Sequence, residues 1–130
     1  MKAAFTSSDG KTIDQHFGQA AEYCIWEIGP ERAELVGKVS PLIPDGADEE
    51  ERTAARVSAV SECTIVCTVQ IGGPPAAKLV ARRIHPMKTG AEVPIAEMVA
   101  KLQQVLKGTP PPWLRKALAG EGTPNFSADE

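Results

Sequence analysis

CTIVCTVQIGGPP, residues 63–75, is the stretch of sequence that decides the fold. Its first nine residues are almost continuously apolar and β-branched, which is typical of a central strand buried on both faces of a sheet. Two glycines end the run, and the two prolines after them suit the first turn of a helix, where an amide has no intrahelical partner. We therefore predict a strand over 63–71 and a helix over 75–83.

The residues after this helix return the chain to the same sheet. HPMKT, residues 85–89, is predicted as a short strand that completes a β-α-β unit with a right-handed crossover. A long helix over 94–107 follows, because apolar residues recur there at helical spacing, and it ends at Gly108. The helix over 75–83 is predicted to bury three apolar residues, Ala76, Leu79 and Val80.

The C-terminal end of the chain is less regular. After three consecutive prolines, WLRKALAG (113–120) is predicted as a short helix. Its Trp113, Leu114 and Leu118 would either cap the core or lie on a partner. We assign residues 1–119 to a single domain and residues 120–130 to a loose tail.

Upstream of the deciding stretch, the sequence predicts three strands. The first covers 2–7 and runs into an Asp-Gly turn at 8–11, since glycine tolerates positive φ there. The other two, over 22–29 and 33–39, form a hairpin joined by a Gly-Pro turn, and Cys24, Trp26 and Ile28 share one face of its first strand.

One helix is predicted between this hairpin and the deciding stretch. Either Asp45 or Asp48 caps it, and its acidic first turn complements the helix dipole. Its apolar side consists of Ala54, Val57 and Val60.

The element order β-β-β-α-β-α-β-α predicts an α/β fold with a mixed sheet. Ligands of such folds gather beyond the carboxyl ends of the parallel strands. The loop after the first strand, 7–18, and the Gly-Gly turn at 72–73 would open onto that same end. We therefore expect His16 to lie near the glycine turn.

Composition excludes several classes of protein. The 130 residues suffice for one domain, and hydrophobic and charged fractions of 42% and 24% are ordinary for a soluble globular protein. We expect neither a membrane span nor a signal peptide. Three cysteines without a CxxC pair argue against a disulfide framework and a tetrahedral zinc site, and they suit a reducing cytoplasm.

The charge is unevenly distributed. Residues 1–71 carry 6 basic and 12 acidic side chains, whereas residues 72–130 carry 8 and 5. The positive charge of a segment from 78 to 88 would attract an anionic ligand of modest size. A solvated helix face explains the same charges equally well. The segment is too narrow to bind a nucleic acid. Its cationic and imidazole side chains are those of Lys78, Arg82, Arg83, His85 and Lys88.

Catalytic arrangements are poorly supported. Asp9 and Asp14 lie in one loop and are the candidates for a carboxylate pair. A Cys-His couple would need an exposed thiol in an electropositive setting, whereas the cysteines fall on predicted strands.

The cysteines are predicted to be mainly structural. Cys63 and Cys67 fall on one face of the buried strand, ~13 Å apart at the usual rise per residue, so they cannot bind one iron together. Cys67 is nearer the glycine turn, and it is therefore the thiol placed to supply a thiolate. Cys24 is expected to pack beside Trp26.

His16 is the strongest candidate for a ligand. It lies in a polar loop between Gln15 and Phe17-Gly18, where a histidine packed in the core is less expected. A neutral imidazole in such a loop is a competent ligand to iron or another transition metal.

Two further features are ambiguous. Gly72 and Gly73 would present amides to an anion at a helix start, but a tight strand-to-helix turn explains them equally, and neither a P-loop nor GxGxxG is present. His85 precedes a proline and is either a strand-entry residue or a ligand beside basic neighbours.

Three stretches of the chain resemble one known family. SSDGKTIDQHFGQA (7–20), IGGPPAAKLVARRIHPMK (71–88) and PPPWLRKAL (110–118) are similar to the NifX/NafY family of dinitrogenase iron–molybdenum cofactor biosynthesis proteins, above all to its NifX branch. The resemblance covers residues 1–119. The HFG triplet and the IGG turn occur across the wider superfamily, whereas IHP and PPPWLRKAL are closer to the nitrogen-fixation members.

The resemblance implies a ribonuclease H-like α/β fold without nuclease activity, with a mixed β-sheet of about five strands flanked by helices. It also implies a cytoplasmic, non-catalytic carrier, its single carrier domain being 1–119. The cargo would be an iron–sulfur cluster precursor of the iron–molybdenum cofactor, or the finished iron–molybdenum cofactor, transiently bound. The family's cluster-associated histidine in the HFG motif falls on His16.

The other site assignments are our own. The predicted cofactor-binding residues are His16, Ser8, Lys11, Phe17, Gly18, Gly72, Gly73, Arg82, Arg83 and His85, and the predicted metal ligands are His16 and Cys67. The expected partners are cofactor-assembly scaffold proteins and components of the apo-dinitrogenase pathway, with no nucleic acid and no membrane. A monomer is favoured.

A chain with one loop histidine, few thiols and no CxxC suits a carrier, because a carrier must release its cluster and a cage of four cysteines would retain it. Two other classes stay open. One is a ribonuclease H-like hydrolase, and the other is a protein–protein adaptor of the nitrogenase assembly machinery that docks through its Pro-Trp-Leu-Arg-Lys segment.

Overall fold

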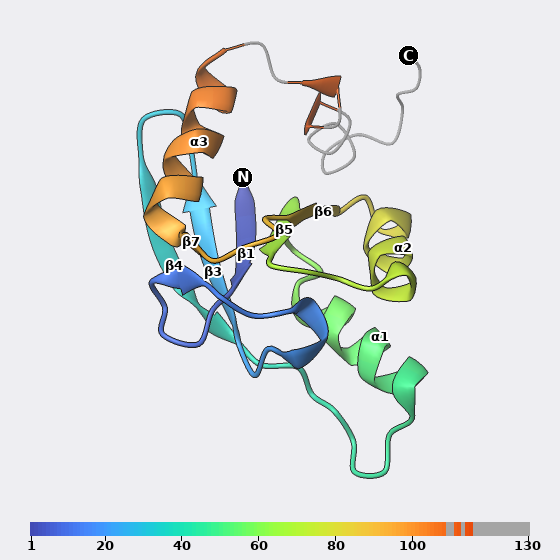
Figure 1. Ribbon diagram of the computed structural model, residues 1–130. Helices are drawn as coiled ribbons and strands as arrows, with labels where there is room; N and C mark the ends of the chain where they lie inside the picture. The colour runs from blue at the N-terminus through green and yellow to red at the C-terminus, as the bar shows by residue number, and fades with distance from the viewer. Residues whose placement is uncertain (109–110, 113, 116–130) are drawn as a thin grey trace.

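Strand β5 (Ile65–Thr68) is the buried strand that the sequence predicts, and it lies inside a five-stranded mixed sheet (Figure 1). The computed structural model describes residues 1–108, 111–112 and 114–115. All four residues of β5 are buried, and β5 pairs in parallel with β1 (Lys2–Thr6) on one side and β6 (His85–Lys88) on the other. The predicted α/β class is therefore confirmed.

β5 is shorter than the strand predicted over 63–71, because the amides of Cys63 and Val69 bond outside the sheet. Before it, the amide of Cys63 donates to the carbonyl of Val60 in the turn that follows α1 (Glu49–Ala59). After it, the amide of Val69 donates to the carbonyl of Gln15 in a distant loop.

The other half of the sheet is an antiparallel hairpin. β3 (Tyr23–Ile28) pairs with β1 and β4 (Ala33–Val39) pairs with β3, so the sheet order is β4-β3-β1-β5-β6. β3 alternates as predicted, since Cys24 and Ile28 enter the same core layer and Trp26 packs against it.

The described helices cover both faces of the sheet (Figure 1). α1 and α2 (Gly73–Ala81) pack on one face, and α3 (Ile95–Lys107) packs on the other. None of the helices in the described ranges has both the length and the apolar character needed to span a membrane. The helical residues in the two core layers are Val57 and Leu79 on the first face, and Ile95, Met98, Val99 and Leu102 on the second.

α1 begins where its acidic first turn predicts. The carboxylate of Asp48 accepts the amide of Glu51 at 2.8 Å, and the carboxylate of Glu51 accepts the amide of Asp48 at 2.9 Å. This reciprocal capping box satisfies amides that the first turn of a helix leaves without partners. Of the two predicted caps, Asp48 is the one that the structure uses.

Three short elements were not apparent from the sequence pattern. β2 (Thr12–Ile13) pairs with β7 (Val93–Pro94) outside the main sheet, and Phe17–Gln19 form a single 3-10 turn. The amide of Ile95 also donates to the carbonyl of Lys11, at 2.8 Å. Together these contacts tie the loop after β1 to the start of α3.

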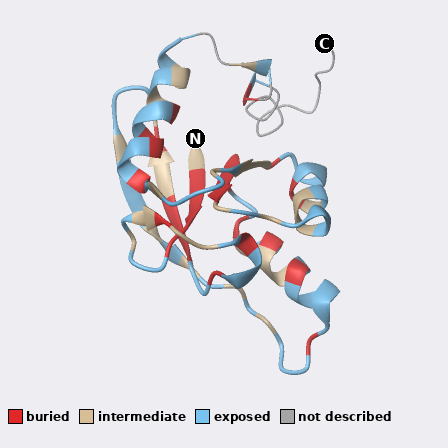
Figure 2. Cartoon of the chain, in the orientation of Figure 1, coloured by how far each residue is buried: buried red, intermediate tan, exposed pale blue. Residues whose placement is uncertain are grey.

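Two predicted side-chain positions are wrong. Cys63 packs in the core layer under α1 and α2, whereas Cys67 packs in the layer under α3, so they do not share a face. The cause is that β5 begins only at Ile65, which leaves Cys63 in a turn that does not follow strand alternation. Val80 is 59% exposed, because α2 lies by the edge strand β6 and buries only Leu79 fully (Figure 2).

The short helix predicted over 113–120 and the tail predicted over 120–130 lie outside the described residues, apart from Leu114 and Arg115. Leu114 is fully buried, and its amide donates to the carbonyl of Pro111 at 3.0 Å. The sequence predicts that this segment either caps the core or lies on a partner. The structure answers this for Leu114, which is packed inside the fold.

Arg83 offers a test of the turn that follows α2. It has a φ of 64°, and the amides of Arg83 and Ile84 donate back to the carbonyls of Val80 and Leu79, a helix ending in which glycine is usual at the left-handed position. Arg83→Gly is expected to raise the free energy of unfolding by about 0.5–1 kcal/mol, because the left-handed strain removed exceeds the added chain entropy.

Arg82→Gly is the matched control, because Arg82 has a φ of −98° and gains nothing from glycine. Urea unfolding of the wild type and of both variants measures the change in the free energy of unfolding. A destabilisation of Arg83→Gly equal to that of Arg82→Gly would contradict the prediction.

Candidate functional site

The loop between β1 and β3 is held together by its own carboxylates. Asp9 Oδ1 accepts the amides of Lys11 and Thr12 at 2.8 and 2.9 Å, and these backbone hydrogen bonds lower the pKa of Asp9. Asp14 accepts both the amide and the hydroxyl of Ser8, at 2.9 and 2.5 Å. Both members of the suggested catalytic pair thus fix the loop, and the Ser8 hydroxyl is already bonded within it.

His16 lies where this loop crosses the carboxyl end of β5. On one side of it, the amide of Val69 donates to the carbonyl of Gln15 at 3.1 Å, and on the other the amide of Phe17 donates to the carbonyl of Gln70 at 2.9 Å. The side chain of His16 is exposed and caps nothing in the 3-10 turn that follows it. A fixed backbone therefore presents an accessible imidazole.

Two buried threonines support the same loop from below. The hydroxyls of Thr6 and Thr68, both 0% exposed, lie 2.8 and 3.0 Å from the carbonyl oxygen of Gln15 and 3.0 Å from each other. Buried hydroxyls are costly unless they are hydrogen-bonded, so this network ties β1, β5 and the loop into one unit.

Phe17 and Gly18, both predicted cofactor contacts, have different surroundings. Phe17 is fully buried, its ring centroid lies 5.3 Å from that of Tyr23, and the Tyr23 hydroxyl donates to its carbonyl at 2.8 Å. Arg56 donates to the Tyr23 hydroxyl and to the carbonyl of Ala20. Gly18 is exposed, and a Cβ placed there would meet no atom within 4 Å. Phe17 thus supports the loop from inside, while Gly18 borders open space.

The glycine turn opens onto the same end of the sheet as His16, as the sequence predicts, because Gln70 bonds to the loop just before the turn. Gly72 is the N-cap of α2 and has no side chain with which to cap it, and Gly73 is the first helical residue. The next two residues are prolines, which carry no amide hydrogen. At the start of α2, the backbone donors that an anion could reach are therefore the amides of Gly72 and Gly73.

The basic segment is split between the two ends of the sheet. Arg82 and Arg83 follow the C-terminus of α2, and His85 pairs with Ile65 at the amino end of β5. The nine-residue α2 separates them from the glycine turn by ~13 Å along its axis. Lys88, the last residue of β6, returns to the end where His16 lies. The structure thus does not bring Arg82, Arg83 and His85 together with His16.

The two remaining candidate ligands are less accessible than His16. Burial lowers the pKa of His85, which keeps its half-buried imidazole neutral at pH 7. Cys67 is fully buried, and burial raises the pKa of its thiol to about 12. The thiol is therefore protonated at neutral pH, whereas a metal ligand must be a thiolate.

Among the residues that the structure describes, no three His, Cys, Asp or Glu side chains lie close enough together to hold a metal ion. Metal contact at the His16 end would therefore rest on very few protein ligands. That arrangement leaves most coordination positions of a bound metal cluster to other groups.

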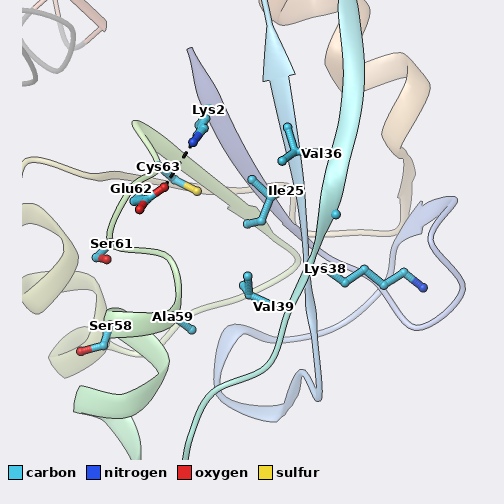
Figure 3. A pocket seen from close by; sticks show the side chains of 11 residues that line it. Lys2, Ile25, Val36, Lys38, Val39, Ser58, Ala59, Ser61, Glu62 and Cys63 are labelled. Carbon is cyan, nitrogen blue, oxygen red and sulfur yellow. Dashed lines mark hydrogen bonds and ion pairs between the residues drawn. The ribbon is translucent and has the colours of Figure 1, made fainter.

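A cleft of about 430 Å³ lies elsewhere, between the end of α1 and the β3–β4 hairpin (Figure 3). At its rim the Lys2 ammonium donates to the Glu62 carboxylate at 3.2 Å. Figure 3 shows Cys63 next to this pair and Lys38 pointing away from it. The residues that line this cleft run from the amino ends of β1 and β5, at Lys2 and Cys63, to Val39 at the end of β4. They include neither His16 nor the glycine turn.

A smaller notch of about 60 Å³ adjoins the loop that carries His16. It is lined by residues of the loop, α1 and the start of α2, namely Phe17, Gly18, Glu49, Arg52, Thr53, Arg56 and Pro75. The sequence analysis missed the two arginines. Their spacing of four residues on a predicted helix was the available signal, because it places both on one face.

Comparison with known proteins places the chain in a family. The family model described as dinitrogenase iron–molybdenum cofactor matches residues 1–105. By structure, the chain is similar to the crystal structure of PH0822, with a TM-score of 0.59 over 80% of this chain and 91% of that one. Their sequence identity is 18%, so this likeness concerns the fold alone.

Curated relatives agree with the family model. The chain is 41% identical to the protein NifX of Herbaspirillum seropedicae over 91% of this chain and 82% of that protein, and 36% identical to NifX of Rhodobacter capsulatus over 99% and 84%. It is 34% identical to NifY of Azotobacter vinelandii, over 93% of this chain and 49% of that longer protein. The chain belongs to the dinitrogenase iron–molybdenum cofactor family, in the group that includes the NifX and NifY proteins.

Proposed function

We propose that this protein binds an iron–sulfur cluster precursor of the iron–molybdenum cofactor, or the cofactor itself, and carries it between partners without catalysing a reaction. The family and the NifX and NifY relatives support a role in cofactor biosynthesis, and a part of the protein named FeMo cofactor biosynthesis protein NifB is also similar to this chain. The observation that carries the proposal is the exposed imidazole of His16 on a backbone fixed from both sides.

The geometry around His16 suits transient binding. One accessible imidazole ligates a single metal of the cluster and leaves its other positions open to the next protein. The neighbours that this model assigns to the cargo are the exposed Ser8, Lys11 and Gly18 and the amides of Gly72 and Gly73. Lys11 adds positive charge, and the glycines leave room for a bulky ligand.

The structure gives less support to four of the predicted site residues, namely Cys67, Arg82, Arg83 and His85. Cys67 as a second ligand stays a prediction, and its burial means that the sheet would have to open before the thiol met a metal. The other three lie at the far end of α2, where they would contact a partner or a remote part of a large cargo rather than the metal at His16.

The finer fold assignment belongs to the same proposal. A central β1 between an antiparallel β3 and a parallel β5, in the order β4-β3-β1-β5-β6, supports a ribonuclease H-like arrangement. Residues 1–119 would act as the single carrier domain, with 120–130 as its tail. Buried cysteines that form no disulfide, all three in the described part of the chain, favour a reducing cytoplasm.

The partners would be cofactor-assembly scaffold proteins and components of the apo-dinitrogenase pathway. Two rival functions remain testable alongside the carrier, a docking adaptor and a ribonuclease H-like hydrolase. Two measurements separate the three. After anaerobic mixing with an iron–sulfur cluster, a carrier acquires visible absorbance and iron, whereas an adaptor stays colourless. In a separate activity assay, a hydrolase shows turnover that depends on divalent metal.

Replacement of the loop histidine tests the ligand assignment. His16→Ala is expected to weaken cluster retention by at least about tenfold, because it removes a metal ligand, and to change the free energy of unfolding by less than about 0.5 kcal/mol, because the side chain is exposed. The measurements are iron content after anaerobic gel filtration and thermal unfolding.

His85→Ala is the matched control, since the chain contains two histidines and this one lies at the opposite end of β5. Equal iron and identical spectra in wild type and His16→Ala would remove His16 from the site. A loss confined to His85→Ala would move the site to the amino end of the sheet.

The buried thiols give a second test. Cys67→Ala and Cys24→Ala are each expected to lower the free energy of unfolding by about 1–2 kcal/mol, because each removes a small buried side chain from the layer under α3. Cys24→Ala is expected to keep the cluster. Parallel measurement of iron content decides the role of Cys67, since a loss of iron that exceeds the loss in Cys24→Ala at equal stability would establish it as a ligand.

A further inference from the structure

The notch beside Gly18 holds positive charge at the end of the sheet where His16 lies. Its volume of about 60 Å³ exceeds the ~15 Å³ that a cavity needs to hold one water molecule, so it admits a small anionic group but not a whole metal cluster. His16 directly precedes the two loop residues that line it. A cluster bound to His16 would therefore reach the notch with one edge.

The two arginines of the notch differ in how much their own contacts restrain them. Arg56 is half-buried and already donates to Ala20 and Tyr23, so it mainly holds the loop in place. Arg52 is exposed, donates to the carbonyl of Ala47 at 2.9 Å, and lies 3.9 Å from the carboxylate of Glu49. An ion pair at that distance between exposed groups is weak, so the guanidinium of Arg52 can exchange it for a better anion.

Three of the predicted cofactor contacts, the cations of Arg82, Arg83 and Lys11, are less well placed to serve this edge. Arg82 and Arg83 lie beyond the C-terminus of α2, ~13 Å along its axis from the glycine turn. The backbone of Lys11 is bonded to Ile95 at the start of α3, which is on the opposite face of the sheet from α1.

We propose that Arg52 is the electrostatic contact for the anionic edge of the cargo, with its guanidinium at the mouth of the notch and His16 bound to the metal. The inference rests on the proposed carrier function and names a residue that it leaves unassigned. Glu49, which lines the same notch, opposes the bound anion and limits the affinity. Arg56 is a positioning residue that keeps Phe17 and Gly18 where the edge of the cargo meets them.

The test uses a synthetic dianionic cubane cluster of four iron and four sulfide ions capped by thiolates, titrated anaerobically into the full chain. Arg52→Gln is expected to weaken its binding about three- to tenfold near 0.1 M salt. Arg52→Lys keeps the charge and should restore most of the affinity. Glu49→Gln removes the opposing charge and should tighten binding.

Arg32→Gln is the matched control, because it makes the same change in net charge at an exposed residue of the β3–β4 turn, beside Met1 and therefore at the opposite end of the sheet from His16. It should leave binding within about twofold of wild type, since surface charges more than a Debye length apart are largely screened. Raising salt to about 1 M, where the Debye length falls to ~3 Å, should remove most of the difference between Arg52→Gln and wild type. Thermal unfolding of each variant shows that the fold is retained.

Equal weakening by Arg52→Gln and Arg32→Gln would overturn the inference, because net charge alone would then explain the effect. If the wild-type chain binds the cluster through His16 and Arg52→Gln binds it with the same affinity, the inference is overturned while the carrier function stays intact. A wild-type chain that does not bind the cluster at all would remove the proposed function, and this inference with it.

Discussion

The carbonyl oxygen of Gln15 is the point on which the site depends. It accepts the amide of Val69 and lies within hydrogen-bonding distance of the hydroxyls of Thr6 and Thr68, both fully buried at the ends of neighbouring parallel strands. Breaking this contact would leave polar groups unpaired in the core, which is costly. The loop is therefore part of the sheet rather than an appendage, and His16 inherits a fixed backbone although its side chain is exposed.

The same network explains why the parallel strand ends early. Val69 and Gln70 continue beyond β5, but the amide of Val69 bonds to Gln15 and the carbonyl of Gln70 bonds to Phe17 instead of to a neighbouring strand. The chain then turns at Gly72 into α2. Because the loop and the turn share these bonds, the backbone at His16 is held in a fixed position relative to the glycine turn. A ligand meets a surface that is already assembled, which lowers the entropy lost on binding.

The sequence predicts the elements well where local chemistry determines them. The β-branched run at 63–71 and the acidic turn after Asp48 are of this kind, because strand burial and helix capping are read from adjacent residues. Prediction from the sequence fails where tertiary packing determines the position of a side chain. The face of Cys63 depends on where β5 begins, and the burial of Phe17 depends on Tyr23 packing against it. The position of Arg52 beside Gly18 depends on how α1 packs on the sheet.

Clustered charge in the sequence and charge at the site are therefore different things. Arg82 and Arg83 lie at the C-terminus of α2, where cations stabilise the helix dipole without any ligand, and this gives the basic cluster a structural reason to exist. Arg52 and Arg56 are separated by Thr53, Ala54 and Ala55 along the chain, and their side chains meet the loop only after folding. A carrier gains from this arrangement. In the proposed carrier, a single imidazole would supply the bond to the metal, and an exposed arginine would supply an attraction that a partner's own cations could match at the moment of transfer. Tight ligation by buried thiolates would offer no such route, since the sheet would have to open before the cargo could leave.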